Sequence, residues 1–280
     1  MKSDSQSMAS TMQNRPGADD ILHRELIWHD EESFRRKPLN AIIYRDPAFQ
    51  AVKESGYKFL QPQFDEWILD FGGGEGKESL EFLKMNLRVI NVDLSTTQLL
   101  RARALVTANN PNANIFYVQA DAENMPFTSG AFRIIYGKAI LHHLDMDSAA
   151  AEINRLLPAE GKASFAEPMT HHPLIKLGRW LTPRLRTVDE HPFTLEATKA
   201  FVRHFAEDHS SAHFLLAPAA YVLRLMPGAE QIFRKIHRWL QKVDKTLFKK
   251  VPGLQKWAWY RVVNIKKSYD VSNPDGATSI

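Results

Sequence analysis

The feature that most constrains this chain is a glycine-rich turn directly after a short apolar run. Residues 66–76 read EWILDFGGGEG, in which the run ends at Asp70 and glycines follow at Gly72, Gly74 and Gly76. This pattern is typical of a buried parallel strand that turns into a helix. Glycine lacks a Cβ, so the turn can adopt positive φ and approach a ligand closely. Asp70 would then lie at the carboxyl end of the strand, where open α/β sheets bind ligands.

The spacing of the glycines excludes two other nucleotide-binding loops. A dinucleotide fingerprint requires G-x-G-x-x-G, but the third glycine position holds Lys77 when counted from Gly72, and Ser79 when counted from Gly74. A P-loop requires Ser or Thr after its Gly-Lys pair, and here Glu78 follows Lys77. The glycines alone therefore do not identify the ligand.

Two further strands are expected to end in carboxylates. The sequence LRVINVD ends in Asp93, and NIFYVQAD ends in Asp121. An acidic side chain at the end of the second strand can accept hydrogen bonds from a ribose diol, and one at the end of the third can accept from an exocyclic amine such as adenine N6. Residues 132–138 and 162–168 are the expected fourth and fifth strands. Carboxylates at three successive strand ends, behind a glycine turn, indicate a cofactor site.

In this order, the motifs resemble those of the class I S-adenosylmethionine-dependent methyltransferases, in the small-molecule, methyltransferase type 11-like branch. The shared motifs are L-D-x-G-x-G-x-G, D-A-E-x-x-P-F and L-H-H, and they lie within residues 65–170. The resemblance implies an α/β fold with a Rossmann-like, seven-stranded methyltransferase sheet. It also implies S-adenosyl-L-methionine as the cofactor. One departure is Arg133, where related chains commonly carry an acidic residue.

The same resemblance implies the residues around the cofactor. Asp70 and the glycines would line its methionine and ribose part, Asp93 would bind the ribose hydroxyls, and Asp121 with Ala122 would bind the adenine. Lys138, just past the fourth strand, would contribute backbone near the sulfonium. The full expected set is Asp70, Gly72, Gly74, Gly76, Asp93, Leu94, Asp121, Ala122 and Lys138.

Three residues are candidates for catalysis. His142 and His143 follow the fourth strand, and Glu167 ends the fifth strand across the same crevice. A histidine can remove a proton from a hydroxyl acceptor near neutral pH, and Glu167 could orient one histidine or bind the acceptor. One of the two adjacent histidines must point away from the site, and the sequence does not say which. Candidate residues of the acceptor pocket are Tyr44, His171, His172 and His191.

Composition narrows the chemistry further. The 280 residues include no cysteine, which excludes disulfides, cysteine-ligated metals and a thiol nucleophile. No metal is expected, since no carboxylate stands at ligand spacing from the paired histidines. The first twenty residues are polar, and no apolar run approaches the about 20 residues of a membrane span. We expect a cytoplasmic protein. The alternative is a cytoplasmic protein that also binds peripherally to the inner face of a membrane.

The chain is expected to divide into six segments. A helix with Thr194 as its N-cap should begin within the fourth of them, and Phe214-Leu215-Leu216 should lie in the sixth strand. The segments are a disordered tail (1–20), an N-terminal helical lid (21–64), the S-adenosylmethionine-binding core (65–170), an acceptor-pocket segment with the sixth strand (171–216), a basic amphipathic helical insertion between the last two strands (217–253), and the last strand with its tail (254–280).

The insertion concentrates positive charge. Residues 224–267 contain twelve Lys or Arg but only two Asp or Glu. Three interpretations stay open: the apolar stripe packs on the protein and the lysines face water, the helix lies on an anionic membrane, or it binds an acidic substrate or partner. Nucleic acid is disfavoured, because GKAILHH replaces the proline-rich loop of nucleic-acid amino-methylating enzymes. The apolar residues at helical spacing are Ile232, Ile236, Trp239, Leu240, Val243 and Leu247.

The sequence thus predicts a methyltransferase that acts on a small molecule. The favoured reaction is O-methylation of a hydroxyl on a lipophilic or glycosylated acceptor, with a histidine as general base. One alternative is C- or N-methylation of a quinone or lipid amine by proximity alone. Another is a non-catalytic, cofactor-binding, membrane-associated assembly factor.

Overall fold

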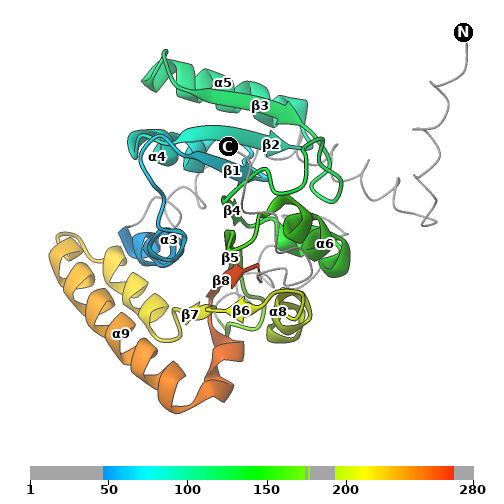
Figure 1. Ribbon diagram of the computed structural model, residues 1–280. Coiled ribbons are helices and arrows are strands. Elements are labelled where there is room, and N and C mark those ends of the chain that lie inside the picture. The colour runs from blue at the N-terminus through cyan, green and yellow to red at the C-terminus, as the bar shows by residue number, and fades with distance from the viewer. Residues whose placement is uncertain (1–46, 174–175, 177–192, 268–280) are drawn as a thin grey trace, which may run out of the picture.

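The computed structural model describes residues 47–173, 176 and 193–267. This part of the chain forms a mixed sheet with helices on both faces (Figure 1). The strands are Trp67–Phe71 (β1), Arg88–Asp93 (β2), Ile115–Gln119 (β3), Ile134–Lys138 (β4), Lys162–Pro168 (β5), Glu207–Asp208 (β6), Ser211–His213 (β7) and Tyr260–Lys266 (β8). The helices are Pro47–Leu60 (α3), Lys77–Lys84 (α4), Thr96–Asn109 (α5), Met146–Leu156 (α6), Leu195–Val202 (α8) and Glu230–Lys250 (α9), with 3-10 helices at Leu141–His143 (η2), Ala217–Leu225 (η3) and Pro252–Trp257 (η4).

The strand order places a crevice at the centre of the sheet. The order is β3-β2-β1-β4-β5-β8-β6, and β7 also pairs with β8. The first five strands of this order are parallel, and β8 runs antiparallel to β5. Chain order reverses between β1 and β4, and ligands bind outside the carboxyl ends of the strands at such a point. The carboxyl end of β1 is therefore the expected place for a cofactor.

Alternating side chains of the strands build a core on each face. Leu69 and Phe165 point to the face that α6 and α8 cover, and Ile68 and Ile134 point to the face that α4 and α5 cover. Figure 1 shows α3 and α4 on one side of the sheet, with α6 and α8 on the other. Each fully buried large apolar side chain stabilises the fold by about 1.5–3 kcal/mol. These two cores hold the carboxyl ends of the strands in place.

The sixth strand departs from its prediction. It is divided into β6 and β7, and Phe214-Leu215-Leu216 lies just after β7, so its placement within the strand was wrong. The amides of Leu215 and Leu216 donate to the carboxylate of Asp244 at 2.9 and 2.8 Å instead of to a neighbouring strand. Phe214 also has a φ of 65°, which is incompatible with an extended strand.

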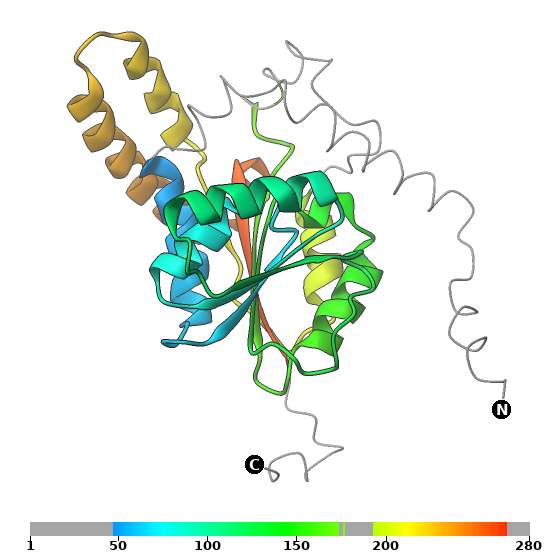
Figure 2. The ribbon, with the colours of Figure 1, turned by 90° about the horizontal axis from the view of Figure 1, so that it is seen from above.

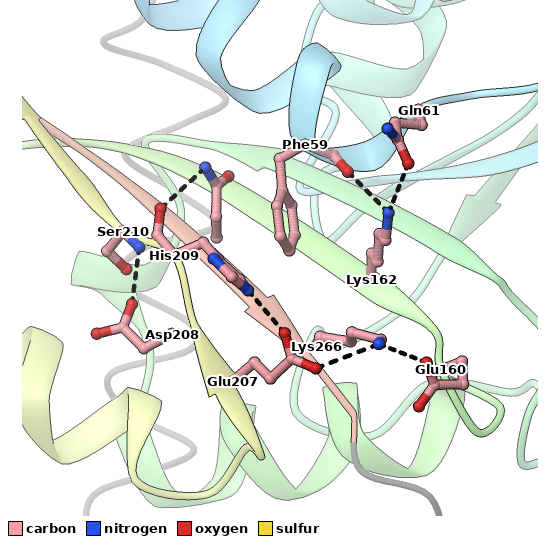
Figure 3. A network of polar contacts seen from close by, with 10 residues as sticks. Phe59, Gln61, Glu160, Lys162, Glu207, Asp208, His209, Ser210 and Lys266 are labelled. Atoms are coloured by element: carbon pink, nitrogen blue, oxygen red, sulfur yellow. Dashed lines mark hydrogen bonds and ion pairs between the residues drawn. The ribbon is translucent and has the colours of Figure 1, made fainter.

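Polar contacts fasten the sheet at the end opposite the crevice (Figure 3). Glu207 of β6 accepts hydrogen bonds from His209 at 2.7 Å and from Lys266 of β8 at 3.2 Å. Lys162 donates to the carbonyl of Phe59 at 3.1 Å and to Gln61 at 3.0 Å, which ties the end of α3 to β5. These contacts lie at the amino end of β5, so they stabilise the fold without entering the expected cofactor site.

The predicted insertion is helical and lies between the last two strands of the chain, β7 and β8. We call residues 217–250, with η3 and α9 packed together, the η3–α9 hairpin, and it projects from the sheet (Figure 2). The helix ends before Pro252, as predicted, and Thr194 accepts from the amide of Ala197 at 3.1 Å as the expected N-cap of α8. Residues 47–60 of the predicted lid form α3, which packs on β5 and β8. The lid residues 21–46 and both predicted tails lie outside the described residues.

Candidate cofactor and catalytic site

The turn after β1 requires glycine. Gly72, Gly74 and Gly76 have φ of 69°, 49° and 74°, a left-handed region that side chains disfavour. A Cβ on Gly72 would lie 2.6 Å from Ile140, and one on Gly76 would lie 2.8 Å from the Cβ of Ala102. A Cβ on Gly74 would meet only Asp93, at 3.9 Å. The turn is thus packed from two sides and open above Gly74.

We expect substitutions in this turn to separate stability from cofactor binding. Gly72→Ala combines left-handed strain with a clash and should cost about 2–4 kcal/mol of unfolding free energy. Gly74→Ala should cost only about 1 kcal/mol, but its methyl group would enter the open space and weaken cofactor binding. Denaturant titration of both variants and calorimetry with S-adenosylmethionine check this. Equal destabilisation by the two substitutions would contradict it.

Asp93 fixes the turn to the end of β2. Its Oδ2 accepts from the amide of Gly74 at 2.8 Å, and its Oδ1 accepts from the amide of Ser95 at 2.9 Å. The carboxylate is half-buried, and each of its oxygens can accept more than one hydrogen bond. Leu94, the next residue, is also half-buried and bonds Gln119 of β3 through its carbonyl at 3.1 Å. The ribose role predicted for Asp93 is compatible with this arrangement.

Asp121 lies just past β3, on the same edge of the sheet. Its Oδ1 accepts from the amide of Glu123 at 2.9 Å, and its backbone forms an isolated bridge with Asn124. Ala122 is half-buried against the core on the α6 side. The adenine role of these two residues stays a prediction, and the structure places both at the carboxyl end of the sheet, beside Asp93.

Asp70 is buried beneath the turn. Its Oδ2 accepts from the Ser79 hydroxyl at 2.5 Å, and Asn91 donates to that same hydroxyl at 2.9 Å. Burial raises the pKa of Asp70 to about 7, although the Ser79 hydrogen bond opposes the shift. The Asn91 side chain also packs closely against the turn: a Cβ added to Gly73 would lie only 2.5 Å from the side-chain nitrogen of Asn91. Asp70 therefore changes its charge near neutral pH.

A cluster around Glu78 was missed by the sequence analysis. The Glu78 carboxylate accepts from Lys138 at 2.8 Å and from Tyr57 at 3.0 Å, and forms an ion pair with Lys53 at 2.9 Å. Burial alone would raise the pKa of Glu78, but the two lysines outweigh it and the pKa is lowered. Lys138 was expected to contribute only its backbone, and the structure adds this side-chain role. No sequence pattern could indicate that α3 brings Lys53 and Tyr57 to the start of α4.

The residues present fit an adenosyl cofactor. The turn leaves open space where a Cβ would otherwise stand, and Asp93 and Asp121 lie beside it at the ends of β2 and β3. The same edge of the sheet carries the buried carboxylate of Asp70 at the end of β1. A ligand with a ribose diol and an exocyclic amine therefore finds acceptors on successive strands.

His142 and Glu167 form a contact across the crevice. Oε2 of Glu167 lies 2.7 Å from Nδ1 of His142, and Oε1 accepts from the amides of Ile140 and Leu141 at 3.0 and 2.9 Å. Glu167 is fully buried and His142 is nearly so. The ring of His143 lies 4.2 Å from that of His142, and His143 is half-buried. Of the two histidines, His142 is the one whose ring the structure holds on Glu167.

Of the four predicted pocket residues, the structure describes His171 and His172. His172 is buried, its Nε2 lies 3.0 Å from the carbonyl of Leu215, and its ring stacks on Trp259. Burial lowers the pKa of His172, although the Leu215 contact opposes the shift, so its ring is neutral near pH 7 and packs the base of the η3–α9 hairpin. His171 is half-buried, and its pocket role stays a prediction. Tyr44 and His191 lie outside the described residues.

The described residues contain neither a metal-binding cluster nor a membrane-spanning helix. Within residues 47–173, 176 and 193–267, no three His, Cys, Asp or Glu side chains gather in a way that could hold a metal ion. None of the helices in these ranges combines the length and the apolar character needed to cross a membrane.

The strand order and the site define a class I methyltransferase fold that binds S-adenosylmethionine. Residues 68–161 match the family model described as a methyltransferase domain. This match and the fold support a class I S-adenosylmethionine-dependent methyltransferase domain of the type 11-like branch over these residues. The predicted Rossmann-like fold and the predicted cofactor are thereby confirmed.

The proteins similar to this chain are named for methyl transfer to different acceptor atoms. The chain is 28% identical to the O-methyltransferase cnsE of Penicillium expansum, over 44% of this chain and 45% of the relative. It is 31% identical to the ubiquinone/menaquinone biosynthesis C-methyltransferase UbiE of Vibrio parahaemolyticus, over 39% and 45%. The geranyl diphosphate C-methyltransferase of Streptomyces coelicolor shares the fold, with a TM-score of 0.55 at 14% identity, over 78% of this chain and 79% of that one. The chain spans about half the length of the curated relatives it matches.

Proposed function

We propose that this chain transfers a methyl group from S-adenosylmethionine to a hydroxyl of a lipophilic or glycosylated small molecule. The observation that carries the proposal is the contact between Glu167 and His142, 2.7 Å long and buried at the crevice. An oxygen acceptor needs a proton removed, and this pair supplies a base for it. The family of the chain supports transfer of a methyl group but does not choose the acceptor atom.

The hydrogen bonds of Glu167 determine the proton position on His142. One carboxylate oxygen is held by two backbone amides, so the other is aimed at Nδ1 of the ring. An ionised carboxylate only accepts hydrogen bonds, so Nδ1 carries the ring proton and donates it to Glu167. Nε2 is then the basic nitrogen. The same carboxylate stabilises the positive charge that the ring gains when Nε2 takes a proton.

The rest of the site would bind and position the reactants. Asp93, Asp121 and the glycine turn would hold the adenosyl part of the cofactor, and Asp70 would lie near its methionine part. When bound, S-adenosylmethionine supplies a methyl group on a positively charged sulfur. His142 would take the proton of the acceptor hydroxyl at Nε2 as the oxygen gains its methyl group. Alignment of the two reactants in a water-poor crevice can contribute about 7–11 kcal/mol to lowering the barrier.

An acceptor panel tests the proposal. The protein would be incubated with methyl-labelled S-adenosylmethionine and three acceptor classes: phenolic or sugar hydroxyls, quinols with a free ring carbon, and phosphorylated ethanolamines. We expect label in a methyl ether of a hydroxyl acceptor, identified by NMR of the product. Label on carbon or nitrogen alone would contradict O-methylation and leave methyltransfer intact.

A second candidate is C-methylation of a quinone-like ring. The similarity to UbiE, whose name specifies a C-methyltransferase of quinone biosynthesis, favours it. Proximity alone would then suffice for the transfer, and activity would depend little on His142. N-methylation of a lipid amine makes the same prediction. A non-catalytic assembly factor would bind the cofactor and give no labelled product with any acceptor class.

A further inference from the structure

The η3–α9 hairpin carries an exposed apolar stripe. Ile232, Ile236 and Trp239 follow helical spacing on one side of α9, and Ile232 and Trp239 are 56% and 62% exposed. On the neighbouring helix η3 and the residue after it, Val222 and Met226 are 66% and 60% exposed. Large apolar side chains gathered on one projecting element are unusual for a surface that meets only water.

This stripe is not the face that packs on the protein. The buried residues of α9 are Phe233, His237, Asp244 and Phe248, about a third of a turn away. Of the three interpretations of the insertion, packing of the apolar stripe on the protein therefore does not hold for Ile232, Ile236 and Trp239. Leu240, Val243 and Leu247 are half-buried, so they join the packed face to the exposed stripe. One apolar side of α9 packs against the protein. A second apolar side is exposed, and none of the described residues covers it.

Basic side chains line the exposed stripe. Lys235 is three residues from Ile232 and four from Trp239, and Lys242 is three residues from Trp239, so each stands beside the stripe. Arg238, Lys245 and Lys249 continue the row along α9 and are exposed. Across the described ranges, none of these side chains forms a salt bridge.

The two acidic residues of α9 do not offset this charge. Glu230 is paired with Arg234 at 2.8 Å and with Arg224 at 3.4 Å. Asp244 is buried, and its carboxylate accepts from the amides of residues 215–217 at 2.8–3.1 Å. The outward side of the hairpin therefore presents apolar and positively charged groups together.

We propose that the η3–α9 hairpin docks on an anionic lipid membrane. An exposed apolar stripe with an interfacial tryptophan and a basic border has the chemistry of a helix that lies in the headgroup region, with its apolar side among acyl chains. A soluble polyanion would engage the lysines and leave the stripe in water. A second copy would bring two basic rows together, and like charges across an interface repel.

The docked hairpin would bring the crevice close to the lipid. Its base is tied through Leu215 to His172, which follows β5 and therefore Glu167. A lipophilic acceptor could then pass from the membrane to the site. The docking inference itself does not depend on the acceptor, and its test needs no cofactor and no turnover.

Vesicle binding tests the inference on the full chain. We expect co-sedimentation with phosphatidylglycerol/phosphatidylcholine vesicles at low salt, and at least about tenfold weaker binding to pure phosphatidylcholine. Salt of about 0.5 M should weaken the anionic binding similarly, because the screening length falls to a few Å. Absence of binding at low salt would overturn the proposal, as would binding that is indifferent to lipid charge.

Matched variants assign the binding to the hairpin. Lys235→Glu with Lys242→Glu should reduce vesicle affinity more than about tenfold, while Lys58→Glu with Lys84→Glu changes the net charge equally on α3 and α4 and should have little effect. Trp239→Ser should also reduce affinity about tenfold, whereas Leu100→Ser, at a site 61% exposed on α5, should not. Equal effects of the hairpin and control variants would overturn the proposal. So would a dimer in sedimentation velocity that Trp239→Ser dissociates, since a second copy would then cover the stripe.

Discussion

Replacing Glu167 by Gln is expected to lower kcat by about a hundredfold to ten thousandfold while cofactor affinity stays nearly unchanged. The amides of Ile140 and Leu141 both donate to one oxygen of Glu167. In the variant the amide oxygen must occupy that position, because an amide NH₂ there would face two donors. The NH₂ group is then directed at Nδ1 of His142, which must accept. The ring proton moves to Nε2, and His142 can no longer take a proton from the acceptor.

Steady-state kinetics with the acceptor found in the panel, together with calorimetry with S-adenosylmethionine, measure this effect. His142→Ala should lose as much activity as Glu167→Gln, and the double variant should lose no more than either, because the two residues act as a unit. His143→Ala is the matched control and should keep most of the turnover. Activity in Glu167→Gln within about threefold of the original would contradict the assigned proton position.

The pH profile separates this role from a structural one. Glu167 is fully buried, so its replacement could also disturb folding. A base on His142 makes kcat rise with pH until the ring is neutral. Glu167→Gln should remove that rise from its residual activity, whereas simple unfolding would scale the profile without changing its shape. Thermal denaturation of the variant gives the folded fraction independently.

The cofactor side of the site was largely predictable from local sequence. Asp70, Asp93 and Asp121 follow apolar runs, and parallel strands bring their carboxyl ends to one edge whatever the helices do. The glycine spacing also carries local information, because positive φ at Gly72 and Gly76 is a property of the turn itself. Resemblance then supplied the chemical identity of the ligand, which spacing alone left open.

The choice between His142 and His143 was not predictable. It depends on the short turn after β4, where Ala139 has a φ of 55° and two amides fix Glu167. The cluster around Glu78 likewise depends on the packing of α3 against β5 and β8, which lie far away in the sequence. Tertiary contacts of this kind leave no periodic signal.

The orientation of α9 shows a further limit of prediction from the sequence. Its apolar residues form two adjacent stripes at helical spacing, and periodicity cannot say which of them meets the protein. The buried Asp244 fixes which side of α9 faces the protein, because its carboxylate accepts hydrogen bonds from the amides of residues 215–217. A charged residue within the packed face therefore placed Ile232 and Trp239 toward the outside.

Replacing Asp70 by Asn is expected to stabilise the protein at alkaline pH. The pKa of Asp70 is about 7 in the folded chain, because burial disfavours the charge, against 3.8 for the ordinary group. Between about pH 4 and 7 the folded state therefore binds more protons than the unfolded state, and stability falls as pH rises. Above pH 7 the loss is constant. A shift of this size corresponds to about 4 kcal/mol, which the neutral Asn side chain avoids.

Denaturant titrations between about pH 5 and 9 measure this effect. Relative to the original chain, the unfolding free energy of Asp70→Asn should rise by about 2.7 kcal/mol between pH 5, where the folded Asp70 is protonated, and pH 9. Asp65→Asn, at an exposed site just before β1, is the control and should leave the difference near zero. Parallel stability curves for the original chain and Asp70→Asn would contradict the raised pKa.

The presence of Asp70 at a buried position where its charge is destabilising is explained if its carboxylate contacts a positively charged group of the cofactor. S-adenosylmethionine carries an α-amino group and a sulfonium, and either would favour ionised Asp70 and lower its pKa. Binding near pH 6.5 should then release a proton from the protein, and calorimetry in buffers of different ionisation enthalpy measures that release. Asp70→Asn should bind the cofactor more weakly and release none. Equal proton release from both chains would mean that Asp70 supports the glycine turn through Ser79 and takes no part in binding.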